Sequence, residues 1–211
     1  MNFMQIMDLG GVLMWVLLAL SVVALAMVVY YAVILRRRWV APEAQALRLR
    51  ALLSERRVHE AREICAGQPT ALSHVVISGL DFLKNNPEAP SGLLKEIMEG
   101  EGARQVNRLH NLIQYLVDIS AIAPMIGLLG TVLGMLRAFN AVGDQLGIAK
   151  PVALAAGVGQ ALITTVAGLC IAIPVMLVYA YFRGRVSRLS GELEGASTEL
   201  LAILSSRRQN T

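Results

Sequence analysis

Charged and aromatic side chains are scarce in this sequence. Only 16% of the residues are charged and 5% are aromatic, whereas 55% are hydrophobic, and the mean hydropathy is +0.57. An ordinary soluble domain carries about 25% charged residues, because its surface faces water. The composition therefore indicates an integral membrane protein.

Cysteine is also scarce, and the common catalytic patterns are missing. Cys65 and Cys170 lack the spacing of metal ligands, and a reducing or lipid environment disfavours a disulfide between them. The three histidines, His59, His74 and His110, stand apart, with no HExxH, Ser/His/Asp or Walker pattern near them. No basic patch is interleaved with aromatic residues, which disfavours nucleic-acid binding. We therefore expect a protein that is not an enzyme, needs no metal or cofactor and binds no nucleic acid.

Three long apolar runs are present, each long enough for the roughly 20 residues of a membrane-spanning helix. They occupy residues 9–35, 116–139 and 152–182. Arginine gathers at one end of each run, and short cytoplasmic segments are rich in Lys and Arg. This bias predicts periplasmic residues 1–8 and 140–151, and cytoplasmic residues 36–115 and 183–211. We expect a protein of the bacterial inner membrane, with its N-terminus in the periplasm and its C-terminus in the cytoplasm.

The polar segments favour helices as well. Helix-forming residues continue over 40–66 until Gly67-Gln68-Pro69, and residues 70–83 form a second candidate. A further helix is predicted to begin near Leu93 and to run into the second span. After Phe182, apolar residues recur at helical spacings at Val186, Leu189, Leu193, Leu200 and Leu204. The predicted fold is all-α, a polytopic membrane protein whose three transmembrane helices are extended by long cytoplasmic helices.

Small residues line one face of the second and third spans. In the second span they are Ala123, Gly127, Thr131 and Gly134, with Gly130 beside them. In the third span they are Gly157, Ala161, Thr164 or Thr165, Gly168 and Ala172. Glycine lets helices approach closely in lipid, so one interpretation is helix packing alone.

The polar residues of the two spans favour a second interpretation. A hydroxyl on each span and Gln160 on the third exceed what packing requires, and polar groups at membrane depth usually face a protein interior or a wet cavity. A single Thr can instead bond to a carbonyl one turn back. Both interpretations stay open at this point.

Two motifs carry a resemblance to a known family. They are APMIGLLGTVLGM over 123–135 and GVGQALITTVAGL over 157–169, followed by Ala172-Ile173-Pro174. Together they resemble the ExbB/TolQ/MotA family of proton-channel subunits, most closely its ExbB and TolQ branches. The resemblance implies a homopentamer among membrane lipids, enclosing an ExbD- or TolR-like single-span partner dimer. A TonB- or TolA-like protein would be a further partner.

The same resemblance implies a role and a set of site residues. The complex would couple the proton motive force to work at the outer membrane or envelope; a non-conducting membrane scaffold that recruits partner helices is the alternative. Thr131 and Thr165, with Thr164 and Gln160, would line the proton pathway, although relatives typically carry Glu where this chain has Gln160. The partner would supply the titrating Asp. The residues expected to pack helices are Pro124, Gly127, Gly130, Gly134, Gly157, Gly168 and Pro174.

The sequence allows two interpretations of Asp118 and two of the prolines in the spans. Asp118, near the cytoplasmic end of the second span, is either a solvated interfacial carboxylate or a proton exit site. Pro124 and Pro174 either kink their helices or are tolerated because neighbours bond the freed carbonyls.

Overall fold

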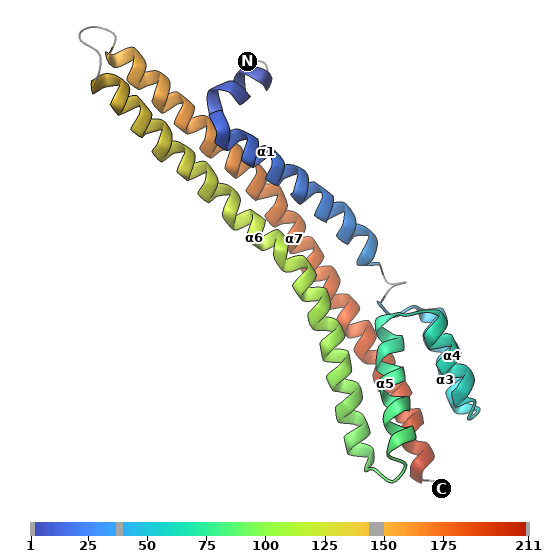
Figure 1. The fold of residues 1–211 in the computed structure, drawn as a ribbon. Helices are drawn as coiled ribbons and strands as arrows, with labels where there is room; N and C mark the ends of the chain where they lie inside the picture. The colour runs from blue at the N-terminus through green and yellow to red at the C-terminus, as the bar shows by residue number, and fades with distance from the viewer. Residues whose placement is uncertain (1–2, 37–39, 144–149, 210–211) are drawn as a thin grey trace. The chain divides into compact units, whose positions relative to one another are not determined.

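The computed structural model describes residues 3–36, 40–143 and 150–209, and within these ranges the regular structure is helical throughout. The helices are α1 (Phe3–Ile34), α3 (Glu43–Ser54), α4 (Val58–Gly67), α5 (Ala71–Asn85), α6 (Ser91–Gly143) and α7 (Lys150–Gln209) (Figure 1). The predicted all-α fold is confirmed.

Three of these helices are long and apolar enough to cross a membrane. Their apolar stretches fall within Gly11–Ile34, Ser91–Asn140 and Gly157–Ser205. α6 has 53 residues and α7 has 60, more than twice the roughly 20 that a bilayer requires. Both helices therefore extend well beyond a single crossing, in agreement with the predicted extensions.

The chain divides into two compact units. The first, which we name the apolar unit, comprises Met1–Tyr30 and Ile113–Tyr181. The second, the polar unit, comprises Tyr31–Leu112 and Phe182–Thr211. α1, α6 and α7 contribute to both.

In the apolar unit, α1 packs on α6 and α7. Met14 and Leu17 of α1 form a buried cluster with Ala123 of α6 and Ala172 of α7. Near its beginning, α1 is interrupted at Gly11, whose backbone has φ 62° and ψ −156°. Glycine adopts this conformation readily because it has no Cβ.

In the polar unit, the end of α7 buries one apolar stripe. Val186, Leu189, Leu193, Leu200 and Leu204 are all at most 3% exposed. These are the residues whose spacing predicted an amphipathic continuation of the third span, and that prediction is confirmed.

A buried polar cluster holds α3 and α5 together. Gln45 of α3 donates to the hydroxyl of Ser73 at 2.8 Å and accepts from Thr70 at 2.7 Å. Ser73 in turn donates to the carbonyl of Gln68 at 2.6 Å. Burial raises the pKa of the nearby Cys65 thiol, and a hydrogen bond with Ser73 partly offsets that rise. A thiol in this state is unreactive, which fits a packing role for Cys65.

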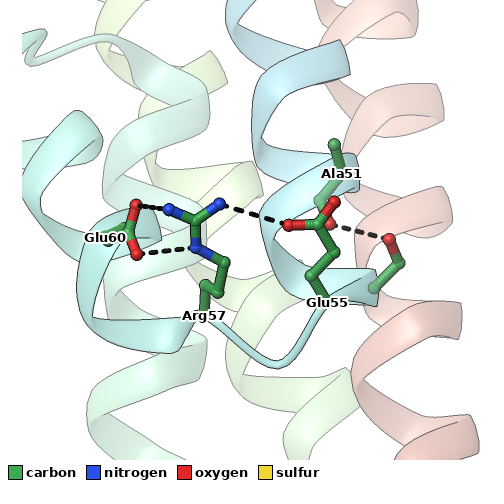
Figure 2. A network of polar contacts seen from close by, with 5 residues as sticks. Ala51, Glu55, Arg57 and Glu60 are labelled. Atoms are coloured by element: carbon green, nitrogen blue, oxygen red, sulfur yellow. Dashed lines mark hydrogen bonds and ion pairs between the residues drawn. The ribbon is translucent and has the colours of Figure 1, made fainter.

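The prediction of one continuous helix over 40–66 is wrong. α3 ends at Ser54 and α4 begins at Val58, and Arg56 between them has a φ of 65°, in the left-handed region. Figure 2 shows the turn, where Arg57 donates to both carboxylate oxygens of Glu60, at 2.5 and 2.6 Å, and to Glu55 at 3.3 Å. The hydrogen bonds with Glu60 and then Glu55 raise the pKa of the Arg57 guanidinium. No Gly or Pro marks this turn, so its position lacked the usual sequence signal.

Candidate functional site

The central feature of the apolar unit is a close seam between α6 and α7. A Cβ added at Gly168 would lie 2.6 Å from the carbonyl oxygen of Ala123, and one at Gly127 would lie 2.9 Å from the carbonyl oxygen of Thr164. At Gly157 the added Cβ would lie 2.3 Å from the Cβ of Ala138. At Gly168 and Gly127 the two backbones lie against each other, and at Gly157 the backbone lies against the methyl group of Ala138. Small residues permit such close packing in lipid.

The expected packing residues lie along α6 and α7, most of them in this seam. Gly127, Gly130 and Gly134 of α6 and Gly168 of α7 are buried, and Gly157 of α7 is half-buried. Pro124 and Pro174 stand inside α6 and α7, and neither ends its helix. Each proline removes one backbone N–H from the hydrogen-bond ladder.

The adjacent hydroxyls of Thr164 and Thr165 lie differently in the seam. Thr164 is 2% exposed and donates to the carbonyl of Ala161 at 2.8 Å. Its hydroxyl also lies 3.4 Å from the carbonyl of Gly127. The same hydroxyl fills the space beside Gly130, because a Cβ added at Gly130 would lie only 2.3 Å from it. Thr165 is half-buried and donates to the same Gly127 carbonyl at 3.2 Å. This arrangement favours a packing role for Thr164 and leaves Thr165 at the edge of the seam.

Thr131 of α6 also lies at the edge of the seam. Its hydroxyl donates to the carbonyl of Leu128, three residues back, at 2.6 Å, and the residue is half-buried. A hydroxyl held in this way keeps lone pairs free to accept a further hydrogen bond. The position therefore combines internal hydrogen bonding with access from outside the helix pair.

α1 covers one flank of the α6–α7 pair. On α7, Ile163 and Ala167 pack against the cluster that contains Met14 and Leu17 of α1. Each is two residues from Thr165, and residues two apart on a helix point about 160° apart. Thr165 therefore points away from the flank that α1 covers.

Thr131 of α6 also points away from the flank that α1 covers. Ile126 packs against the α1 cluster, and it lies five residues before Thr131, which places the two side chains about 140° apart around the helix. Thr131 and Thr165 consequently share the flank that α1 leaves uncovered.

Ser120 of α6 and Met176 of α7 lie on the same flank, farther along the two helices. The hydroxyl of Ser120 lies 3.6 Å from the sulfur of Met176. Ser120 precedes Thr131 by eleven residues and Met176 follows Thr165 by eleven, which is about three full turns in each helix. We name the surface with Ser120, Thr131, Thr165 and Met176 the open flank. Ser120 was not among the predicted site residues, although its spacing from Thr131 is a signal in the sequence.

Asp118 does not contribute to this surface, and the side chain of Gln160 is not described. Asp118 is exposed on α6, but it lies thirteen residues before Thr131, about 140° away around the helix. The backbone of Gln160 belongs to α7, whereas its side chain is outside the described part of the structure. Within the described residues, no three His, Cys, Asp or Glu side chains come together as metal ligands.

The open flank is suited to hydrogen bonding without ionisation. A Thr hydroxyl donates, accepts and rotates, and it carries no charge at neutral pH. Two such hydroxyls on neighbouring helices can solvate a carboxyl group or a water molecule without holding a proton permanently. A titrating group would have to come from elsewhere, because the flank itself contains no carboxylate in its described part.

Comparison with known proteins reveals the relatives of this chain. Residues 68–195 match the model of the MotA/TolQ/ExbB proton channel family. The chain is 32% identical to an ExbB-like biopolymer transport protein of Synechocystis, over 91% of this chain and 76% of that protein. It is 33% identical to the Tol-Pal system protein TolQ of Haemophilus influenzae, over 56% of this chain and 53% of TolQ. It is 42% identical to the biopolymer transport protein exbB1 of Vibrio cholerae, over 34% of this chain and 32% of that protein.

The family match includes both halves of the seam and the whole open flank, and it covers more than half of the sequence. The Synechocystis alignment extends the similarity over nearly the full chain. The predicted family is confirmed: this membrane protein belongs to the MotA/TolQ/ExbB proton channel family.

Proposed function

We propose that this chain is the channel subunit of an inner-membrane motor that couples the proton motive force to work at the outer membrane or envelope. Five copies surround a dimer of single-span, ExbD- or TolR-like partner helices. The open flank of each copy faces the enclosed partner, and a TonB- or TolA-like protein receives the work. The chain has no catalytic role of its own, and its polar unit lies in the cytoplasm.

The observation that carries this proposal is the shared direction of Thr131 and Thr165. Both hydroxyls point away from the flank on which α1 packs, although they belong to different helices and both lie in apolar segments. A scaffold held together by packing alone has no need of two half-buried hydroxyls on an uncovered surface. A channel that must solvate a partner's carboxyl group does.

In the proposed complex, the partner and this chain have different chemical roles. The partner's Asp takes up and releases the proton, and the ring of threonines stabilises both of its protonation states. Gln160 replaces the Glu typical of relatives, so it supplies hydrogen bonds and no second titrating site. A potential of 100 mV supplies about 2.3 kcal/mol for each proton that crosses, enough for a few protons to rearrange a protein contact.

The proposal predicts proton flux that depends on the partner. The chain would be co-purified with a short single-span protein encoded next to it, one with an Asp just inside its span, and reconstituted into vesicles. A pH-sensitive dye inside the vesicles should report proton entry when a potential is applied. The chain alone, or the complex with that partner's Asp replaced by Asn, should give only background flux.

The outcome also decides between a channel and a scaffold. A stable complex that conducts no protons under any potential would contradict the channel and favour a non-conducting scaffold. Mass measurement of the same complex would test the expected five copies and two partner chains.

A further inference from the structure

The polar unit carries a group of exposed arginines where its chain segments adjoin the apolar runs. Arg36, Arg108, Arg183 and Arg188 are all exposed. Among the described side chains, none of the four has a carboxylate within salt-bridge distance. We name these four residues the arginine collar.

Contacts within the polar unit bring the collar to a common level. Arg185 of α7 donates from Nε to the carbonyl of Leu35 at 3.3 Å, so Arg36 lies beside the same turn of α7 as Arg183. A groove between α6 and α7 is lined by Val106 from α6 and Ser190 from α7. Each of these lies two residues from a collar arginine, Arg108 or Arg188.

Acidic residues are absent from the sequence around the collar. The stretches 31–42, 102–112 and 182–191 contain eight arginines and no Asp or Glu. The acids of the polar unit lie instead in 43–101 and 192–199, where several pair with basic side chains, as Arg62 pairs with Asp81 at 2.5 Å. The stretches that carry the collar are therefore basic without an acidic residue of their own, whereas the rest of the polar unit is mixed in charge.

We propose that the arginine collar binds the headgroups of anionic phospholipids. The guanidinium group is planar, stays charged and matches a phosphate with two N–H donors. Arg36 and Arg183 directly follow the apolar runs 9–35 and 152–182, and Arg108 and Arg188 lie within eight residues of the runs 116–139 and 152–182. This is near the level at which lipid phosphates lie. Charge and position together select a lipid rather than a soluble phosphate compound. The inference is independent of proton conduction.

The test compares two variants of equal charge. In R108Q/R183Q/R188Q, three collar arginines are lost. In R48Q/R56Q/K84Q, three exposed cations of the same unit are lost away from the collar. Each purified protein is reconstituted into nanodiscs of phosphatidylcholine with and without phosphatidylglycerol, and the phosphatidylglycerol retained per chain is measured.

The collar variant should lose its preference for phosphatidylglycerol by about fivefold or more, because one basic residue near an anionic surface contributes about that factor. The control variant should keep the preference of the unmodified chain, and inorganic phosphate should not compete. Equal losses in the two variants would mean a general charge effect and would overturn the proposal. So would an unchanged preference in the collar variant, which would leave the arginines as topology signals only.

Discussion

Replacing Gly168 by Ala is expected to destabilise the apolar unit, because the seam leaves no room for a methyl group at this position. The new Cβ would lie 2.6 Å from the carbonyl oxygen of Ala123 and 3.3 Å from its carbonyl carbon. Backbone atoms cannot move aside as a flexible side chain can, so α6 and α7 must separate. Overpacking of this kind typically costs about 1–3 kcal/mol, and the helices lose further contacts along the seam.

The measurement is the thermal unfolding of the detergent-solubilised protein, followed by size-exclusion chromatography after heating. Gly184→Ala is the matched control. Gly184 lies on the same helix as Gly168, and a Cβ added there has no neighbouring heavy atom within 4 Å. The Gly168 variant should unfold at a clearly lower temperature than the control. If the two variants melt together, the close seam between α6 and α7 does not exist in the protein.

Replacing Thr165 by Val is expected to abolish most of the partner-dependent activity, while the same change at Thr164 leaves it largely intact. Both changes remove a hydroxyl and keep the shape of the side chain. Thr165 is half-buried at the open flank, whereas Thr164 is 2% exposed and lies inside the seam. Thr164→Val should therefore cost about 1 kcal/mol of stability, the usual net value of one hydrogen bond.

Proton flux into vesicles and the melting temperature are measured for both variants. Loss of a group that stabilises a charged intermediate typically lowers a rate by about 10²-fold or more. We expect a decrease of this size in the proton flux of the Thr165→Val complex. Thr131→Val should behave like Thr165→Val, and Thr165→Ser should restore the flux. Normal flux in a stable Thr165→Val complex would remove that hydroxyl from the mechanism.

The sequence was sufficient to predict the helices and the family, because both depend on patterns along the chain. The stripe from Val186 to Leu204 predicted the amphipathic end of α7, and each of its five apolar members is buried. The break between α3 and α4 was missed because Arg56 adopts a left-handed conformation without glycine. Such a residue is held by its surroundings, here including the backbone hydrogen bond from the Arg57 N–H to the carbonyl of Leu52 at 2.9 Å, and propensity does not report it.

The roles of neighbouring threonines could not be separated from the sequence for a geometric reason. Thr164 and Thr165 differ by about 100° around α7, so the choice between them depends on where α6 and α1 pack. α1 is apolar on all sides, and such a helix gives no indication of which face contacts its neighbours. Only the contacts of Met14 and Leu17 with α6 and α7 identify the covered flank, and thereby the open one.

The direct measurement is the chemical accessibility of cysteines placed at Thr131 and Thr165. Cys65 and Cys170 are first replaced by Ala, and Ile126→Cys, on the flank that packs against α1, is the control. A water-soluble thiol reagent is applied to the reconstituted protein with and without its partner. Cysteines at 131 and 165 should react without the partner and be protected by it, while the cysteine at 126 should be unreactive in both cases. If the cysteines at 131 and 165 are unreactive in the absence of the partner, Thr131 and Thr165 do not face an open, partner-binding surface.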